Sequence, residues 1–327
     1  MLNIFFDINY IKTKKVFLTK NIRYSKLINL IINIGNIFKI PIPRQFIFSG
    51  PHKRMNNILK TFKGPNFSIN KKKYKNNYIV NFDSGTESLV NNLLKDPENK
   101  ILVGPLFNVE YQKRLIEYTN NYPNIKKLVA SDAAYNNAVY ELGLNVEPEN
   151  VYVCPSGVIS KKELNKNRAE YKRDDKCLVY FKKREKKDLD ALLDFLKTKD
   201  QKYELFEYGK YNNRQLKESA KKCSFGIIMS RPETQGFGIQ EIMACNLPII
   251  VWDKTVNHYE HLSLSGTTVT SWDNNCGEIV YELHELKKII NSFKNNLNLY
   301  NPGSHVLNNL TFEKFNENLK FLFKSKI

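Results

Sequence analysis

The sequence lacks several features that would point to a function class at once. Its 327 residues include five cysteines, which lie far apart and form no C-x-x-C motif. A disulfide-stapled scaffold and a zinc ribbon are therefore excluded, and we expect a reducing, cytoplasmic compartment. The histidines form no H-E-x-x-H motif. Without an apolar run of about 18 residues or a signal-like N-terminus, we expect no membrane-spanning helix and no secretion.

Negative charge is also scarce. The chain has 51 Lys and Arg against 33 Asp and Glu, which gives a formal net charge of +18. Such an excess suggests a polyanionic partner, which is a nucleic acid, an acidic membrane surface or a phosphorylated small molecule. A composition rich in Lys, Asn and Ile would give the same excess as solvated surface lysines. The net charge alone therefore leaves these alternatives open.

The length and the hydrophobic pattern predict two α/β domains. At 327 residues the chain exceeds the roughly 250–300 residues at which one hydrophobic core stops growing. Short apolar runs that end in turn residues alternate with helical patterns, and this alternation occurs twice along the chain. It is typical of parallel sheets covered by helices, which bind ligands at the carboxyl ends of their strands. Examples of these runs are 78–82, 101–103, 128–130, 177–181, 225–229 and 249–252.

The predicted domains are residues 1–159 and 160–310, with the charged stretch Ser160–Asp175 as the linker. Residues 311–327 predict a helix that packs back toward the first domain. Two similar α/β domains imply a ligand-binding cleft between them. Residues 24–40 carry apolar side chains at helical spacing and predict an amphipathic helix, which packs on the first domain or lies on a membrane surface.

The stretch 230–241, S-R-P-E-T-Q-G-F-G-I-Q-E, carries the clearest chemical signal. It leads from a strand through Gly236 and Gly238, which allow the backbone to approach a ligand, into a helix whose first N–H groups favour an anion. Glu233 and Glu241 frame this turn and suit hydrogen bonds from sugar hydroxyls. A phosphate between two polyols is a nucleotide sugar. An ordinary strand-to-helix turn with an exposed glutamate has the same spacing.

Glu233 and Glu241, with seven residues between them, resemble the E-x7-E motif of retaining GT-B glycosyltransferases of the group-1, family 4-like type. The next residues, I-M-A-C-N-L-P-I-I at 242–250, are similar to that family's E-A-M-A-x-G-x-P-v-i, with Asn246 in place of the usual glycine. The segments 151–158, V-Y-V-C-P-S-G-V, and 208–211, Y-G-K-Y, are also similar to family segments. The resemblance implies a GT-B fold, in which two Rossmann-like domains face a cleft.

The resemblance also implies roles for individual residues. Glu233 would be catalytic and contact the donor sugar near the reacting carbon, and Glu241 would hold the ribose hydroxyls. The family's Arg and Lys, five residues apart, correspond to Lys182 and Lys187 here. Arg184 is a competing candidate, because a guanidinium binds phosphate through two parallel hydrogen bonds. The remaining candidate donor-binding residues in this domain are Gly236, Phe237, Gly238, Tyr208 and Gly209.

In the first domain, the segment S-G-P-H-K at 49–53 predicts a turn that faces the cleft. It resembles the glycine-containing loop that approaches the donor phosphates and the acceptor. Gly50 is therefore a candidate donor-binding residue, and His52 a candidate catalytic residue. A surface histidine fits the sequence equally well. Other strand-end residues are candidates for the acceptor side, namely Asp83, Ser84, Asn108, Ser131 and Asp132.

The function that the resemblance implies is transfer of a sugar from a UDP- or GDP-sugar to a hydroxyl of a glycan, lipid-linked or protein-linked acceptor. The configuration would be retained, no metal or cofactor would be needed, and no nucleic acid would bind. The D-x-D at 188–190 lies inside a predicted helix, and the four histidines after residue 250 show no ligand spacing, so we expect no metal site. The alternatives are another GT-B enzyme, such as a nucleotide-sugar 2-epimerase or a phosphorylase, and a basic nucleic-acid-binding protein.

Overall fold

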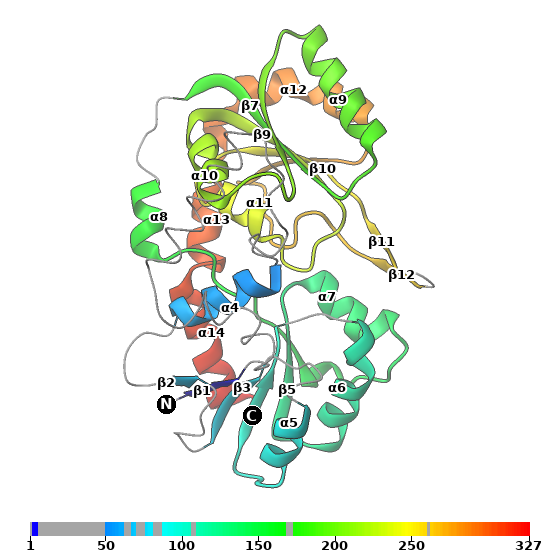
Figure 1. The fold of residues 1–327 in the computed structure, drawn as a ribbon, viewed down its shortest axis with the longest axis vertical. Coiled ribbons are helices and arrows are strands. Elements are labelled where there is room, and N and C mark those ends of the chain that lie inside the picture. The colour runs from blue at the N-terminus through cyan, green and yellow to red at the C-terminus, as the bar shows by residue number, and fades with distance from the viewer. Residues whose placement is uncertain are drawn as a thin grey trace. The chain divides into compact units, whose positions relative to one another are not determined.

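The computed structural model describes residues 2–5, 50–61, 67–69, 76–80, 87–105, 109–167, 173–259 and 262–327, which form two compact units (Figure 1). Among these residues, unit 1 comprises those up to Gly157 and again those from Phe312 onward, and unit 2 runs from Val158 to Thr311. The sequence analysis predicted domain boundaries at 159/160 and 310/311. The predicted amphipathic helix at 24–40 lies outside the described residues.

Unit 1 is built on a six-stranded sheet of order β2-β1-β3-β4-β5-β6, in which every pairing is parallel. The strands are β1 (Leu2–Phe5), β2 (Phe67–Ile69), β3 (Asn77–Val80), β4 (Lys100–Val103), β5 (Ile125–Val129) and β6 (Val151–Val153). The main helices are α4 (Gly50–Thr61), α5 (Glu87–Leu94), α6 (Val109–Asn121), α7 (Asp132–Asn136) and α14 (Phe312–Ser325). The predicted alternation of strands and helices is therefore confirmed.

Helices cover both faces of this sheet, because the strands are apolar on both sides. On one face, Ile58 of α4 and three residues of α14, namely Phe315, Leu319 and Leu322, pack against the strands. On the other face, Leu93 of α5 and Leu115 of α6 do the same. The C-terminal helix is therefore part of the core of unit 1.

Two local predictions were wrong. The segment 49–53 was expected to be a turn, but α4 already begins at Gly50. Pro51 suits the first turn of a helix, because its fixed φ is helical and its missing N–H would have no partner there. The stretch 160–175 was expected to be a linker, but it contains α8 (Lys161–Asn167), anchored by the buried Leu164, and the start of β7.

Unit 2 has a five-stranded parallel sheet of order β13-β10-β9-β7-β8. Its strands are β7 (Asp174–Lys182), β8 (Lys202–Glu207), β9 (Cys223–Ser230), β10 (Ile249–Trp252) and β13 (Gly277–Val280), and an antiparallel pair, β11 (Val256–Tyr259) and β12 (Leu262–Ser265), follows β10. The main helices after α8 are α9 (Lys186–Thr198), α10 (Asn213–Lys222), α11 (Phe237–Met243), α12 (Leu283–Asn295) and α13 (Pro302–Asn309).

The topology of unit 2 predicts where a ligand binds. Helices α9 and α12 pack on one face of the sheet, and α10, α11 and α13 pack on the other (Figure 1). The first strand, β7, lies between β8 and β9. The chain therefore runs from β7 to β8 on one side and then crosses back to β9 on the other side. In open parallel sheets, ligands bind outside the carboxyl ends of the strands at such a switch point. Here that point lies between the ends of β7 and β9.

In the part of the chain that the structure describes, no helix is both long enough and apolar enough to cross a membrane. All five cysteines are buried and free. Burial raises the pKa of Cys154, Cys177 and Cys276 to about 12 each.

Candidate functional site

The switch point of unit 2 holds an ion pair between β7 and the loop that follows β9. Lys182, the last residue of β7, places its Nζ 2.6 Å from Oε1 and 2.7 Å from Oε2 of Glu233. Ser230, the last residue of β9, donates its hydroxyl to Oε1 of Glu233 at 2.7 Å. The Lys182 and Glu233 side chains are only 18% and 12% exposed. The Glu233 carboxylate is therefore held in one position by two neighbouring strand ends.

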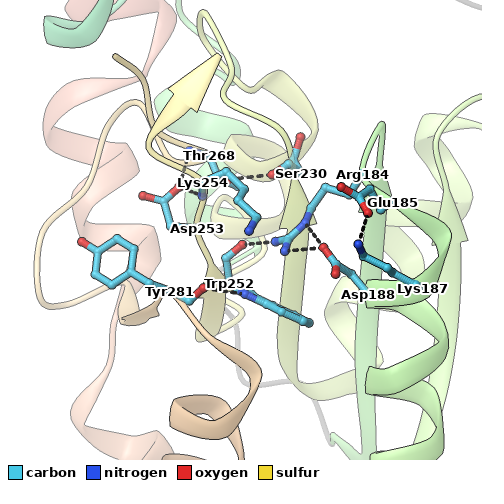
Figure 2. Close-up of polar contacts among 10 residues, drawn as sticks. All are labelled: Arg184, Glu185, Lys187, Asp188, Ser230, Trp252, Asp253, Lys254, Thr268 and Tyr281. Atoms are coloured by element: carbon cyan, nitrogen blue, oxygen red, sulfur yellow. Dashed lines mark hydrogen bonds and ion pairs between the residues drawn. The ribbon is translucent and has the colours of Figure 1, made fainter. Parts of the chain in front are cut away.

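The backbone around Glu233 is braced by the loop after β12. The N–H of Glu233 donates to the carbonyl of Thr267 at 2.9 Å, and the Thr268 hydroxyl donates to the carbonyl of Ser230 at 2.9 Å. Asp253, which is buried, accepts hydrogen bonds from the N–H groups of Thr268 and Lys254 (Figure 2). The ends of β9 and β10 thus share one polar network, and the sequence analysis did not find these supporting residues.

The second glutamate of the motif lies on α11 and is 4% exposed. Its Oε1 accepts a hydrogen bond from Nδ2 of Asn213 at 3.3 Å and lies 3.9 Å from Nζ of Lys217. Asn213 and Lys217 are four residues apart and therefore lie on one face of α10. Glu241 is accordingly a buried carboxylate with partners from a neighbouring helix, and an exposed surface glutamate is excluded at this position.

The turn between the two glutamates has the backbone that its glycines predict. Gly236 caps α11 with φ of 70°, a left-handed conformation that glycine adopts at no steric cost. The amide of Gln240 is buried, and its Nε2 has no hydrogen-bond partner among the residues that the structure describes. Since α11 has seven residues, its dipole is weak, and the side chains rather than the helix end define this site.

Gly238 lies directly against Tyr180. A Cβ at Gly238 would lie 2.8 Å from the Tyr180 hydroxyl and 3.2 Å from its Cζ. Tyr180 is 2% exposed and packs edge-on against Tyr211, with 6.1 Å between ring centroids. Tyr180, held by Tyr211, packs against the first turn of α11. It leaves no room for a side chain at position 238.

We expect Gly238→Ala to destabilise unit 2 by about 1–3 kcal/mol, because Tyr180 is too confined to move away. Urea unfolding measures this change. Tyr180→Phe removes the hydroxyl and leaves Cζ as the nearest atom, at 3.2 Å. The double variant should therefore recover most of the loss. Equal losses with and without the hydroxyl would contradict this account.

Two further predicted cations lie in different surroundings. Arg184 is 2% exposed, and its guanidinium donates to the carboxylate of Asp188 at 2.8 Å and to the carbonyl of Trp252 (Figure 2). It also lies 4.4 Å from the centroid of the Trp252 ring. Lys187 is 78% exposed and pairs with Glu185 at 2.6 Å. Arg184 thus links β7 to β10, and phosphate binding by Arg184 or Lys187 stays a prediction.

Other predicted residues meet at the same switch point. Tyr208, after β8, is 38% exposed, and Nζ of Lys182 lies 4.7 Å from its ring centroid. Gly209 follows with φ of 90°. Phe237 is buried in the first turn of α11. The structure therefore brings together the predicted Lys182, Tyr208 and Glu233.

The candidate residues of unit 1 are less fully described. Gly50 and His52 lie in the first turn of α4, and the structure describes only their backbone. Ser131 accepts a hydrogen bond from the N–H of Ala134 and caps α7, while Asp132 is exposed at the start of that helix. The predicted Asp83, Ser84 and Asn108 lie outside the described residues.

No protein-family model matches the sequence, and no curated protein matches it. Solved structures with a similar fold include the pneumococcal O-GlcNAc transferase GtfA in complex with UDP and GlcNAc, at 11% identity and a TM-score of 0.47. That likeness covers 76% of this chain and 56% of GtfA, so the chain spans little more than half of the transferase.

Two other solved structures match over more of the chain. WaaG, a glycosyltransferase involved in lipopolysaccharide biosynthesis, has 12% identity and a TM-score of 0.39, with 85% of this chain and 95% of WaaG covered. The UDP-GlcNAc 2-epimerase of Neisseria meningitidis bound to UDP-GlcNAc has 13% identity and a TM-score of 0.41, with 99% of each chain covered. At such identities and scores, the residues of unit 2 carry the functional assignment on their own.

Proposed function

We propose that this protein is a glycosyltransferase that moves a sugar from a UDP- or GDP-sugar to an acceptor hydroxyl. The observation that carries this proposal is the pair of anchored carboxylates around one glycine turn. Glu233 is fixed by Lys182 and Ser230 at the switch point, and Glu241 is buried on α11. Carboxylates accept hydrogen bonds only, so this pair suits two polyols with a diphosphate between them.

In this proposal each glutamate binds one end of the donor. Glu233 accepts hydrogen bonds from hydroxyls of the sugar, close to the carbon that reacts. Glu241 accepts them from the ribose hydroxyls of the nucleotide. Lys182 contacts the diphosphate, and two exposed cations at the carboxyl ends of neighbouring strands, Arg231 after β9 and Lys254 after β10, add positive charge at the same edge.

The proposed transfer breaks the bond between the anomeric carbon and the diphosphate oxygen, and it forms a bond between that carbon and the acceptor oxygen. The departing phosphate oxygen takes the proton of the acceptor hydroxyl on the same face of the sugar, so the configuration is retained. Lys182 stabilises the negative charge that develops on the leaving diphosphate. We propose that the reaction therefore needs no metal ion.

The acceptor side of the proposal rests on the sequence. We propose a glycan, lipid-linked or protein-linked acceptor, with His52 of unit 1 as a catalytic residue and Gly50 as a donor-binding residue. Contact with a membrane surface through basic residues belongs to the same proposal. Binding of nucleic acid is not part of it, although the charge of +18 made it an alternative.

The proposal predicts that UDP or GDP stabilises the purified protein in a thermal-shift assay and that a UDP- or GDP-sugar releases its nucleotide. Glu241→Gln should weaken nucleotide binding about tenfold or more in calorimetry, because a hydrogen bond to a charged group contributes about 1.5–3 kcal/mol. Glu163→Gln is the matched control, since Glu163 also lies 3.9 Å from Lys217 but is 56% exposed and outside α11.

Three outcomes would contradict the proposal. Stabilisation by a short RNA and by no nucleotide would favour the nucleic-acid alternative. Conversion of a nucleotide sugar to its epimer, without transfer to an acceptor, would favour an epimerase. Equal nucleotide affinity of the Glu241→Gln and wild-type proteins would remove the ribose role of Glu241.

A further inference from the structure

Unit 2 contains a second cluster of chemically active side chains, apart from the glutamate site. Asp273, Cys276 and His305 each offer one ligand atom, and these atoms lie within 4.8 Å of one another. Cys276 and His305 are buried, and the Asp273 side chain is 42% exposed. Cys276 directly precedes β13, at the amino ends of the strands. Glu233 follows the carboxyl end of β9, so the two clusters lie at opposite ends of the strands.

Backbone hydrogen bonds hold the three side chains close to one another. The N–H of Cys276 donates to the carbonyl of Asp273 at 2.9 Å, which closes a turn between them. The N–H of Asn275 donates to Oδ1 of Asp273 at 2.9 Å and fixes that oxygen, leaving Oδ2 to face His305. His305 lies on α13, whose start is tied to the same loop by the N–H of Asn301, which donates to the carbonyl of Asn275.

The imidazole of His305 is held at both nitrogens. Nδ1 lies 2.7 Å from Oδ2 of Asp273, and Nε2 lies 2.8 Å from the hydroxyl of Ser271. Histidines that bind metals characteristically bind through one ring nitrogen and donate from the other to a nearby oxygen. Ser271 supplies that outer oxygen, and Nδ1 faces the carboxylate of Asp273.

We propose that Asp273, Cys276 and His305 bind one zinc ion. A carboxylate oxygen, a thiolate and an imidazole nitrogen are the ligand types that zinc takes, at bonds of about 2.0–2.3 Å. A tetrahedral ion with such bonds places its ligands roughly 3.3–3.8 Å apart. Sγ of Cys276 is already 3.7 Å from Oδ1 of Asp273. The 2.7 Å contact between Oδ2 of Asp273 and Nδ1 of His305 must lengthen to admit the ion, and the Asp273 side chain, at 42% exposure, has room to shift.

Binding of the ion changes where the protons of Cys276 and His305 lie. The Cys276 thiol loses its proton to solvent as the sulfur binds the ion. His305 binds the ion through Nδ1, so its ring proton is carried on Nε2 and donated to Ser271. With three protein ligands, the fourth position of the tetrahedron takes water. The ion would connect the loop before β13 to α13, and its effect is on the stability of unit 2 rather than on sugar transfer.

The same contacts also resemble a nucleophilic Ser–His–Asp arrangement, with Ser271 beside His305 and Asp273 beyond it. One observation favours the metal. The Asp273 carboxylate also accepts from the Cys276 thiol, which has no part in such a triad.

The experiment uses the purified full-length protein after treatment with EDTA and dialysis. Titration with Co²⁺, a spectroscopic substitute for zinc, should give absorption from thiolate-to-cobalt charge transfer and from a tetrahedral ion, saturating at one equivalent. Zn²⁺ should displace the cobalt and raise the melting temperature. Cys276→Ser should lose the thiolate band, and Asp273→Asn should weaken binding at least about tenfold.

Cys177→Ala is the matched control, because Cys177 is equally buried in unit 2 but lies outside the cluster. It should bind cobalt like the wild type. Circular dichroism establishes that each variant is folded. Absence of the thiolate band in the wild type, or an unchanged band in Cys276→Ser, overturns the proposal. Labelling of Ser271 by a fluorophosphonate, without metal uptake, would replace it with the triad. None of these outcomes depends on sugar transfer.

Discussion

Glu233→Gln is expected to lower the rate of sugar transfer at least about 100-fold, while UDP or GDP still binds with unchanged or higher affinity. A fixed negative charge beside the reacting carbon stabilises the transition state more than the ground state, and groups of this kind contribute about 10²–10³-fold to the rate. The nucleotide itself does not need that charge. Loss of the carboxylate also frees Lys182, which is 2.6 Å from it, to interact with the diphosphate.

The glutamine keeps the shape of the side chain and its hydrogen bond from Ser230, so the loop should stay folded. Single-turnover rates with a UDP- or GDP-sugar and calorimetry with the free nucleotide separate the two effects. Glu185→Gln is the control, because Glu185 is 70% exposed and pairs with Lys187 outside the switch point. Wild-type transfer by Glu233→Gln would refute the assigned role. Loss of nucleotide binding would mean that Glu233 serves nucleotide binding rather than catalysis.

Much of the architecture follows from local sequence. The strand 249–252 is buried at every position, and such uninterrupted apolar runs are typical of parallel sheets with helices on both faces. The helix α10 at 213–222 also has local signals in the sequence. Asn212 and Gln215 form a capping box there, and Leu216 and Ala220 lie on the buried face. The capping box and the apolar face of this helix lie within a few residues of each other, so both can be recognised in the sequence.

The sequence analysis missed features that depend on one residue or on residues far apart in the chain. The helix α8 was predicted as linker because charged residues dominate it, and only Leu164 anchors its apolar side. His305 was not expected to bind a metal, because its neighbours in the cluster, Asp273 and Cys276, are about 30 residues away in sequence. No spacing rule reveals such a group, since the turn before β13 and α13 bring it together only in the fold.

In the candidate site, too, the local motif could be predicted from the sequence and the distant contacts could not. The motif located Glu233 and Glu241, but the partners that hold them come from other elements. Lys182 and Glu233 are 51 residues apart, and Asn213 and Glu241 are 28 apart. Arg184 is a candidate for phosphate by residue type, and its contacts with Asp188 and the Trp252 carbonyl could not be read from the sequence. Burial and pairing of charges depend on packing, which residue spacing does not encode.

A buried lysine in unit 1 gives the second large expected effect. Lys127 lies on β5 at 0% exposure, between Val103 of β4 and Val151 of β6. Burial lowers the pKa of Lys127 to about 7. Each unit of pKa shift corresponds to about 1.4 kcal/mol, so a charged Lys127 would cost the folded state several kcal/mol relative to the unfolded chain. Lys127→Met should therefore stabilise unit 1.

The gain should depend on pH with a definite sign. Between pH 7 and 10.5 the unfolded chain keeps a proton on Lys127 that the folded state has lost, so the free energy of unfolding of the wild type rises with pH in this window. Lys127→Met lacks this dependence. Its gain in the free energy of unfolding is thus largest at and below pH 7, about 4 kcal/mol as an upper limit, and falls to about 1 kcal/mol at pH 10.

Urea unfolding at pH 7 and pH 10, followed by circular dichroism, measures the two gains. Lys95→Met is the matched control, because Lys95 is an exposed lysine of unit 1 and should give a small change that is equal at both pH values. The difference between the two gains is the decisive quantity, since extra apolar contact from methionine contributes equally at both. Equal gains at pH 7 and pH 10 would mean that Lys127 keeps its proton in the folded state, paired well enough to offset its burial.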